Sequence, residues 1–330
     1  MWKRSEASSV LSATTGIALL FAGCTMQVGD QEVDEHTEAL TGSTHKYVFV
    51  ISMENHDASQ IYGNTTDAPY INNTLIPSYA RSTNFKDELP SLASEPHYLW
   101  MEAGTNAFSD HTFTTDDAPS RSNSTASTAH LVTQIKNATN GVSWLSYQEG
   151  INSTTGACPI ASSGFYQPKH NPVVFFRDVS GSTPSKNNLY CAMHHKALSL
   201  LAGDLAKHAV ASYNFITPNQ CHDMHGQSGC PNGNTIRAGD AWLAANLPAL
   251  ITFVNANDGV IFVTWDEGSS TNFMPFLAIG PHVKVGYASG VSYNHSSMLK
   301  SIENILQVPT LPSVASANTL SDLFVAGAFP

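Results

Sequence analysis

Apolar residues in this chain gather into short runs that are separated by longer polar stretches. The runs are rich in β-branched and aromatic residues and cover 47–53, 142–147, 210–216, 260–265 and 276–279. Continuous apolarity, rather than alternation, is typical of strands buried on both faces of a parallel sheet. Between the runs, apolar residues recur at helical spacing in 193–208, 240–253 and 296–306. The alternation predicts a single α/β domain with a doubly wound, mostly parallel sheet and helices on both faces.

Two segments between the apolar runs have the composition of loops. Residues 105–140 are rich in Ser, Thr, Asn and Asp, and residues 149–190 are rich in Gly, Ser and Pro. We expect both segments to be insertions that lie over one end of the sheet.

The first 24 residues have the features of an export signal. A short basic segment is followed by an apolar stretch and then by "LFAGC". This ending resembles a bacterial lipoprotein signal, which would place a lipid on Cys24. Phe21 replaces the smaller aliphatic residue that is usual in such signals, so ordinary signal-peptidase cleavage is the alternative. We therefore expect an exported protein, either a lipoprotein of the outer membrane or cell surface or a secreted protein.

Residues 25–45 are acidic and polar and show no apolar period. Such a composition predicts a flexible tether rather than a folded element. The predicted organisation is therefore a signal peptide at 1–24, a tether at 25–45 and one folded domain at 46–330.

Charge and cysteine content restrict the partners and the compartment. The 330-residue chain has a formal net charge of −11 and 15 Lys and Arg residues, which makes nucleic acid an unfavourable partner. Four cysteines remain besides Cys24, and in an oxidising compartment they predict two disulfides, Cys158–Cys191 and Cys221–Cys230. Zinc binding by the same four is the competing interpretation, although the chain has no C-x-x-C pair.

Polar side chains follow three of the apolar runs at the point where each run ends. They are Glu54 and Asn55, then His222 and Asp223 in "TPNQCHDMH", and then Asp266 and Glu267. The carboxyl ends of parallel strands share one sheet edge, so these groups should converge, together with His295 before the last helix. Clustered carboxylates repel one another unless a cation lies among them. The pattern predicts a site for a divalent ion such as zinc, manganese, calcium or magnesium, whereas helix capping is the alternative role for any single pair.

A serine is placed where it could act as a nucleophile. Ser94 precedes the predicted helix "YLWMEAG", and free backbone N–H groups at a helix N-terminus favour an anion. A bound metal would lower the pKa of such a hydroxyl, which suits attack on phosphorus. Ser91 is the minor alternative, and a purely structural helix cap is the other interpretation of Ser94.

Six motifs together resemble a known family. They are "ISMENHDASQIYGN", "PSLASEPHYLWMEAG", "KHNPVVFF", "TPNQCHDMH", "VTWDEG" and "YNHSSMLKSIENIL". In this order they resemble the bacterial phosphoesterase family, a branch of the alkaline phosphatase superfamily. That family includes acid phosphatases, phosphatidylinositol-3-phosphatase-like enzymes and phosphatidylcholine-type phospholipases C. The resemblance extends over about 45–310 and implies an alkaline phosphatase-like fold.

The resemblance also implies roles for individual residues. Ser94 would be the nucleophile, His170 and His295 would be catalytic histidines, and the metal ligands would be Glu54, Asn55, His222, Asp223, Asp266 and Glu267. One departure from the family pattern is Pro96-His97-Tyr98, where Pro-Asn-Tyr is usual. His97 would then alter how the substrate is held or how activity depends on pH.

These observations predict a metal-dependent phosphomonoesterase that resembles acid phosphatases. Ser94 would form a phosphoserine intermediate, and His170 or His295 would protonate the leaving group. A phospholipase C-type phosphodiesterase that acts on lipid headgroups is the alternative enzyme, and a non-catalytic surface-binding lipoprotein is the alternative outside enzymes. The expected partners are a phosphate-ester substrate, with phospholipids and phosphoinositides among the candidates, and the membrane through the lipid anchor.

Overall fold

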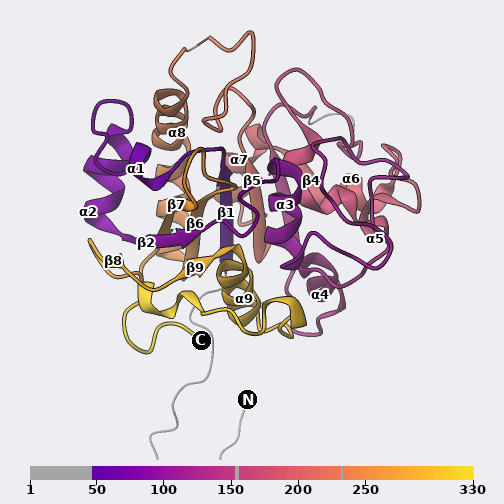
Figure 1. Cartoon of the computed structure of the whole chain (residues 1–330). Helices are drawn as coiled ribbons and strands as arrows, with labels where there is room; N and C mark the ends of the chain where they lie inside the picture. The colour runs from indigo at the N-terminus through magenta and orange to yellow at the C-terminus, as the bar shows by residue number, and fades with distance from the viewer. Residues whose placement is uncertain (1–46, 153–155, 232) are drawn as a thin grey trace, which may run out of the picture. The chain divides into compact units, whose positions relative to one another are not determined.

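Nine strands of the described residues form one sheet in the order β4-β3-β5-β1-β6-β7-β2-β8, and β9 pairs with β2 (Figure 1). The structure is a computed structural model that describes residues 47–152, 156–231 and 233–330, all within the compact unit Thr41–Pro330. The predicted signal peptide at 1–24, with Cys24, and the tether at 25–45 lie outside the described residues.

The predicted strands are confirmed, with small shifts at their ends. The strands are β1 Tyr47–Met53, β2 Ala80–Lys86, β3 Trp144–Gln148, β4 His195–Ala197, β5 Tyr213–Thr217, β6 Gly259–Trp265, β7 Phe273–Ile279, β8 Ala288–Ser289 and β9 Tyr293–Asn294. The central strands pair in parallel, β3 with β5, β5 with β1 and β1 with β6. β7 runs antiparallel to both β6 and β2. The sheet is therefore mostly parallel, as predicted.

The helices vary widely in length. They are α1 Ala58–Ile61, α2 Ile76–Ser78, α3 Ser94–Ala103, α4 Leu131–Asn137, α5 Arg177–Ser180, α6 Leu189–His194, α7 Leu201–Ala206, α8 Thr235–Ala256 and α9 His295–Leu306. The helices predicted at 240–253 and 296–306 are confirmed as α8 and α9. The single helix predicted at 193–208 is wrong, because β4 interrupts it. In β4, backbone pairing with β3 replaces helical hydrogen bonds, a long-range contact that local spacing does not reveal.

Helices cover both faces of the sheet, as contacts from β1 show. Phe253 of α8 makes edge-to-face ring contacts with Tyr47 and Phe49. On α3, Met101 Sδ accepts a hydrogen bond from Ser52 Oγ. Odd and even positions of a strand point to opposite faces, so α8 and α3 lie on opposite sides of β1. This arrangement explains why Val48–Met53 are buried without alternation.

Two disulfides brace loops of the domain: one joins the 149–190 insertion to α6, and the other closes on itself the loop between β5 and α8. Cys158 is bonded to Cys191 and Cys221 to Cys230, which confirms the predicted pairing. The predicted loops at 105–140 and 149–190 carry short helices, among them α4 and α5. Within the described part of the chain, no helix is both long and apolar enough to cross a membrane.

Candidate active site

Polar residues converge at the carboxyl ends of β1, β5 and β6. The backbone N–H of Glu54 donates to the carbonyl of Asp223 over 2.7 Å, and the N–H of Asp266 donates to Met53 over 3.0 Å. The N–H of Asn55 donates to Asp266 Oδ1 over 3.2 Å. These bonds join three loops that are far apart in the sequence, so the predicted convergence is present in the structure.

Asp57 holds the loop that follows β6. Its Oδ1 accepts hydrogen bonds from the backbone N–H groups of Ser269, Ser270 and Thr271 at 3.0–3.2 Å, and its Oδ2 accepts one from the Ser270 hydroxyl. Burial opposes ionisation of Asp57, but these hydrogen bonds outweigh it and lower the carboxyl pKa. The loop also needs Gly268, because an added Cβ would lie 2.1 Å from the Thr271 carbonyl oxygen. Asp57 therefore fixes the chain next to the acidic pair.

Ser94 is the first residue of α3 and points its hydroxyl at two carboxylates. Its Oγ donates to Glu54 Oε2 at 3.1 Å and lies 3.4 Å from Glu267 Oε1. The N-cap position belongs to Ala93, which provides no side-chain cap. Ser94 is buried, whereas Ser91 is exposed. Ser94 is therefore not the N-cap of α3. Its buried hydroxyl beside two carboxylates also makes it a better candidate nucleophile than the exposed Ser91.

The carboxylates around Ser94 are buried and close enough to repel one another. Burial, followed by the Asp223 charge, raises the pKa of Glu54 well above its usual value. Burial and the Glu54 charge do the same for Asp266, and burial raises the pKa of Asp223 and Glu267. Such a cluster is stable only with bound protons or a cation among its members.

Several buried atoms in this cluster have no hydrogen-bond partner. They are Asn55 Oδ1, His170 Nε2, Asp223 Oδ2 and Asp266 Oδ2. Unpaired buried polar atoms are rare in proteins and need an explanation. Oxygen and imidazole donors of this kind suit a divalent cation. The residues present therefore fit a metal ion.

Among the residues that the structure describes, two groups of side chains have ligand atoms close enough to hold an ion. In one, atoms of Glu54, His170 and Asp223 lie within 4.8 Å of one another, and in the other the same holds for His97, Asp266 and Glu267. Burial lowers the pKa of His170 well below its usual value, which keeps a ring nitrogen free to bind. Its Nε2 lies 3.4 Å from Glu54 Oε1, and its ring stacks on Tyr98.

The role of His97 was not predicted, although the sequence shows that this residue departs from the family pattern. Its Nδ1 lies 2.8 Å from the Ala93 carbonyl oxygen and its Nε2 lies 2.9 Å from Asp87 Oδ1. Both partners only accept hydrogen bonds, so both ring nitrogens carry protons. Burial opposes this charge, but Asp87 and Asp266 raise the pKa of His97 to about 9. His97 is therefore a cation beside Asp266 and Glu267 rather than a ligand with a free lone pair.

Two other histidines that were predicted to belong to the site, His295 and His222, contact residues outside the carboxylate cluster. His295 Nε2 lies 2.9 Å from the Trp265 carbonyl oxygen, so its ring braces the end of β6 directly before Asp266. His222 Nδ1 lies 2.9 Å from Glu149 Oε1, and its side chain is 36% exposed. Among the described residues, neither histidine belongs to the two groups that could hold an ion.

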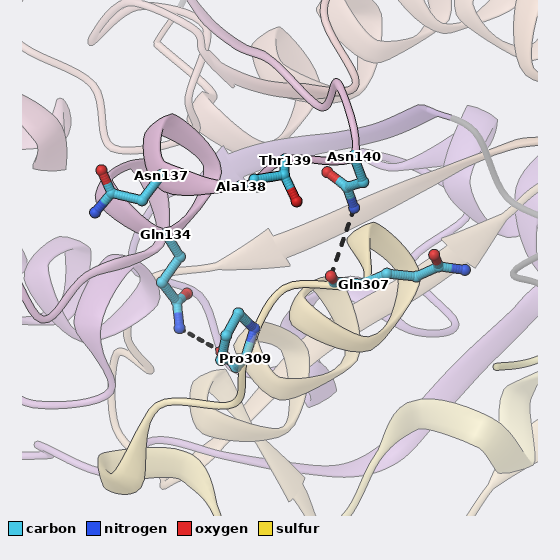
Figure 2. A pocket seen from close by; sticks show the side chains of 7 residues that line it. All are labelled: Gln134, Asn137, Ala138, Thr139, Asn140, Gln307 and Pro309. Atoms are coloured by element: carbon cyan, nitrogen blue, oxygen red, sulfur yellow. Dashed lines mark hydrogen bonds between the residues drawn. The ribbon is translucent and has the colours of Figure 1, made fainter.

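A separate pocket lies between the C-terminal ends of α4 and α9 (Figure 2). It has a volume of about 460 Å³ and is lined by amide and hydroxyl side chains, among them Gln134, Asn140 and Gln307. Gln134 donates to the Pro309 carbonyl oxygen and Asn140 to that of Gln307. No residue that lines this pocket is titratable.

Comparison with known proteins decides the family. Residues 90–309 match the model of the phosphoesterase family. The chain belongs to the phosphoesterase family. Phosphoesterases are hydrolases of phosphate ester bonds, so the alternative of a non-catalytic binding protein is set aside.

Curated relatives carry phosphatase names. A phosphatidylinositol-3-phosphatase of Mycobacterium tuberculosis is 28% identical over 85% of this chain and 83% of its own length. A phosphate-repressible acid phosphatase of Penicillium chrysogenum is 27% identical over 52% of this chain and 41% of its own. A probable acid phosphatase of Kluyveromyces lactis is 25% identical over 85% of this chain and 62% of its own. The chain thus spans less than two thirds of either fungal relative.

Solved structures confirm the fold. A protein of the alkaline phosphatase superfamily from Vibrio parahaemolyticus superposes with a TM-score of 0.54 at 10% identity, covering 85% of this chain and 71% of its own. A phosphonate monoester hydrolase from Silicibacter pomeroyi gives a TM-score of 0.53 at 12% identity, with 84% and 76% covered. The alkaline phosphatase-like fold expected from the motifs is therefore confirmed.

Proposed function

We propose that this phosphoesterase is a metal-dependent phosphomonoesterase with Ser94 as its nucleophile. The observation that carries the proposal is the position of the Ser94 hydroxyl, 3.1 Å from Glu54 Oε2 and 3.4 Å from Glu267 Oε1. A serine hydroxyl needs activation to attack phosphorus, and this one lies among acceptors that could remove its proton. The names of the phosphatase relatives support the same reaction class.

The metal would be held by the residues whose polar atoms are left without partners. These are Asn55, His170, Asp223 and Asp266, with Glu54 and Glu267 beside them. A divalent ion bound there would lower the pKa of the serine hydroxyl and neutralise charge on the phosphate oxygens. Zinc, manganese, calcium and magnesium all remain candidates, because the donor set mixes carboxylate, amide and imidazole groups.

The chain's own groups account for the first proton transfer. As Ser94 Oγ bonds to phosphorus, its proton passes to Glu54 Oε2, the acceptor that it already contacts. The bond from phosphorus to the leaving oxygen breaks, and that oxygen takes a proton from solvent water. Water then hydrolyses the phosphoserine and returns a proton to Ser94 Oγ. His97, fixed as a cation, compensates negative charge on Asp266 and Glu267 throughout.

We propose roles other than the predicted one of proton donor for His170 and His295. Burial lowers the pKa of His170 well below its usual value and that of His295 to about 4, so both are neutral near pH 7. A neutral imidazole is a poor proton donor for an alkoxide at that pH. We therefore propose that His170 is a metal ligand and that His295 positions the end of β6.

The substrate class and the location of the protein are proposals of the same kind. The name of the mycobacterial relative favours a phosphoinositide or another phosphomonoester lipid as substrate. The two disulfides support an exported protein, since such bonds persist in oxidising compartments. Lipid attachment at Cys24, which would bring the enzyme to a membrane, stays a prediction.

A pair of serine variants tests the proposal directly. Ser94→Ala should reduce turnover of p-nitrophenyl phosphate at least ~1000-fold, because a nucleophile has been removed. Ser91→Ala is the matched control, since Ser91 is exposed in the loop directly before α3, and it should keep near wild-type turnover. Near wild-type turnover by Ser94→Ala would contradict the assignment. Indifference to thorough removal of divalent ions by a chelator would contradict the metal.

A further inference from the structure

Lys169 brings a positive charge to the edge of the acidic cluster. It directly precedes His170, and its ammonium forms an ion pair with Asp116 Oδ2. The Lys169 side chain is 15% exposed and that of Asp116 is 38% exposed, so the ion pair lies at the rim of the site, where water reaches its carboxylate. Asp116 Oδ1 in turn accepts a hydrogen bond of 3.3 Å from the backbone N–H of Glu95, the residue after Ser94. A single carboxylate therefore lies between the Lys169 ammonium and the first turn of α3.

The position of Asp116 does not depend on Lys169. The neighbouring residues of Asp116 are fastened to α3, because Glu95 Oε2 accepts hydrogen bonds from Thr115 Oγ1 at 3.0 Å and from the N–H of Asp117 at 2.8 Å. Glu95 itself is fully buried. Substituting Lys169 therefore leaves the loop attached, whereas the ammonium, on a flexible four-carbon chain, is free to change partners.

The charge of Lys169 also reaches the candidate ligands. Burial raises the pKa of Glu54 and Asp223, and the Lys169 charge opposes that increase at both carboxyls. Burial lowers the pKa of His170, and the Lys169 charge lowers it further. The ammonium therefore acts on Glu54, the carboxylate that the Ser94 hydroxyl contacts.

We propose that Lys169 leaves Asp116 to pair with a non-bridging oxygen of the substrate phosphate, and so selects dianionic monoesters over monoanionic diesters. This inference rests on the proposed function, because it assumes an ester phosphate at Ser94. A phosphomonoester carries close to two negative charges at neutral pH, whereas a phosphodiester carries one. The dianion competes better than the single charge of Asp116 for the ammonium, and a monoanion has no such advantage.

The test compares two esters with variants of Lys169. Lys169→Met keeps the length of the side chain and removes its charge. The kcat/KM for p-nitrophenyl phosphate should fall about tenfold more than that for bis(p-nitrophenyl) phosphate, because one extra charge interacts with Lys169. Inhibition by inorganic phosphate should weaken by a similar factor. Lys169→Arg should keep most of the preference for the monoester.

Two further variants separate selection from structure. Asp116→Asn removes the competing carboxylate, so inorganic phosphate should inhibit more strongly than in the wild type. Lys196→Met is the matched control, because Lys196 forms a comparable ion pair with Asp204 at 2.7 Å but belongs to β4 and not to the site. It should leave the ratio of the two kcat/KM values unchanged. Melting temperatures of all variants show whether each one is folded.

The results distinguish a wrong role for Lys169 from a wrong proposed function. Equal losses on both esters in a folded Lys169→Met protein would overturn the role of Lys169 while leaving the phosphomonoesterase intact. If Lys169→Met does not fold, Lys169→Gln takes its place, because it also removes the charge. An equal loss on both esters in folded Lys169→Gln overturns the role, and a larger loss on the monoester supports it. A wild-type enzyme that hydrolyses neither ester would overturn both the function and the inference.

Discussion

His130 connects three helices through a buried ion pair, and its removal should destabilise the protein in a pH-dependent way. The ring is fully buried, with Nδ1 3.2 Å from Glu102 Oε1 and Nε2 3.0 Å from Asp178 Oδ1. It also stacks on Phe176 at a centroid distance of 3.8 Å. Glu102 belongs to α3 and Asp178 to α5, and His130 is the residue directly before α4. The network therefore ties both insertions to the helix that presents Ser94.

The expected cost follows from what His130→Ala leaves behind. Glu102 is 1% exposed, its Oε2 has no partner, and its Oε1 would keep only the hydrogen bond from the Val132 N–H. Breaking a buried pair by removing one partner typically costs about 3–5 kcal/mol. We expect a loss of that size in the free energy of unfolding at pH 6.

The sign of the pH dependence follows from the raised pKa. Burial opposes the charge on His130, but the hydrogen bonds to Asp178 and Glu102 outweigh it and raise the pKa above the usual value. A histidine with a raised folded-state pKa contributes stability that is fully present below about pH 6.5, its ordinary pKa, and is lost as pH rises through the folded pKa. The stability difference between wild type and His130→Ala should therefore shrink above pH 6.5.

Urea unfolding from pH 5.5 to 9 measures this difference. His194→Ala is the control, because His194 stacks on Trp144 and Nδ1 lies near the Tyr190 carbonyl oxygen rather than a carboxylate. Its stability difference from wild type gives the cost of losing a stacked histidine ring. A difference for His130→Ala that is constant, or that grows as pH rises, would refute the reasoning.

Three further predictions concern the site itself. Asp57→Ala should lower kcat about tenfold or more and cost about 2 kcal/mol of stability, because four hydrogen bonds to the 268–271 loop are lost. Steady-state kinetics measure the change in kcat, and urea unfolding measures the change in stability. Gly268→Ala should give a similar loss of activity, since its Cβ would lie 2.1 Å from the Thr271 carbonyl oxygen; unchanged kinetics would contradict this placement of the loop. A divalent ion at about 100 times its Kd should stabilise metal-free protein by about 2.7 kcal/mol in thermal unfolding, and Asp223→Asn should abolish most of that gain.

The sequence predicts the sheet well because its central strands are buried on both faces. β1 and β6 are buried almost without interruption, so their apolar runs mark them clearly. β2 was not predicted, since its residues ARSTNFK are mostly polar and its place depends on pairing with β7. The same limit explains β4, which forms only because β3 lies beside it. Long-range backbone pairing is the information that local spacing lacks.

The candidate site, like the sheet, could be predicted only in part. Strand ends place Glu54, Asp223 and Asp266 by topology, so their convergence could be expected before the structure. The position of His222 could not, because a loop with a disulfide decides which of its side chains faces inward. The charge of His97 depends on Ala93 and Asp87, and only the fold brings Asp87 to its ring.

Trapping the covalent intermediate tests the proposed chemistry most directly. Metal-loaded enzyme would be mixed with a phosphomonoester, quenched in acid within the first turnover and digested for peptide mass spectrometry. We predict a phosphoryl group on Ser94, and none when Ser94→Ala is treated in the same way. Rapid turnover with an unmodified Ser94 peptide, or a phosphoryl group on another residue, would contradict Ser94 as the nucleophile.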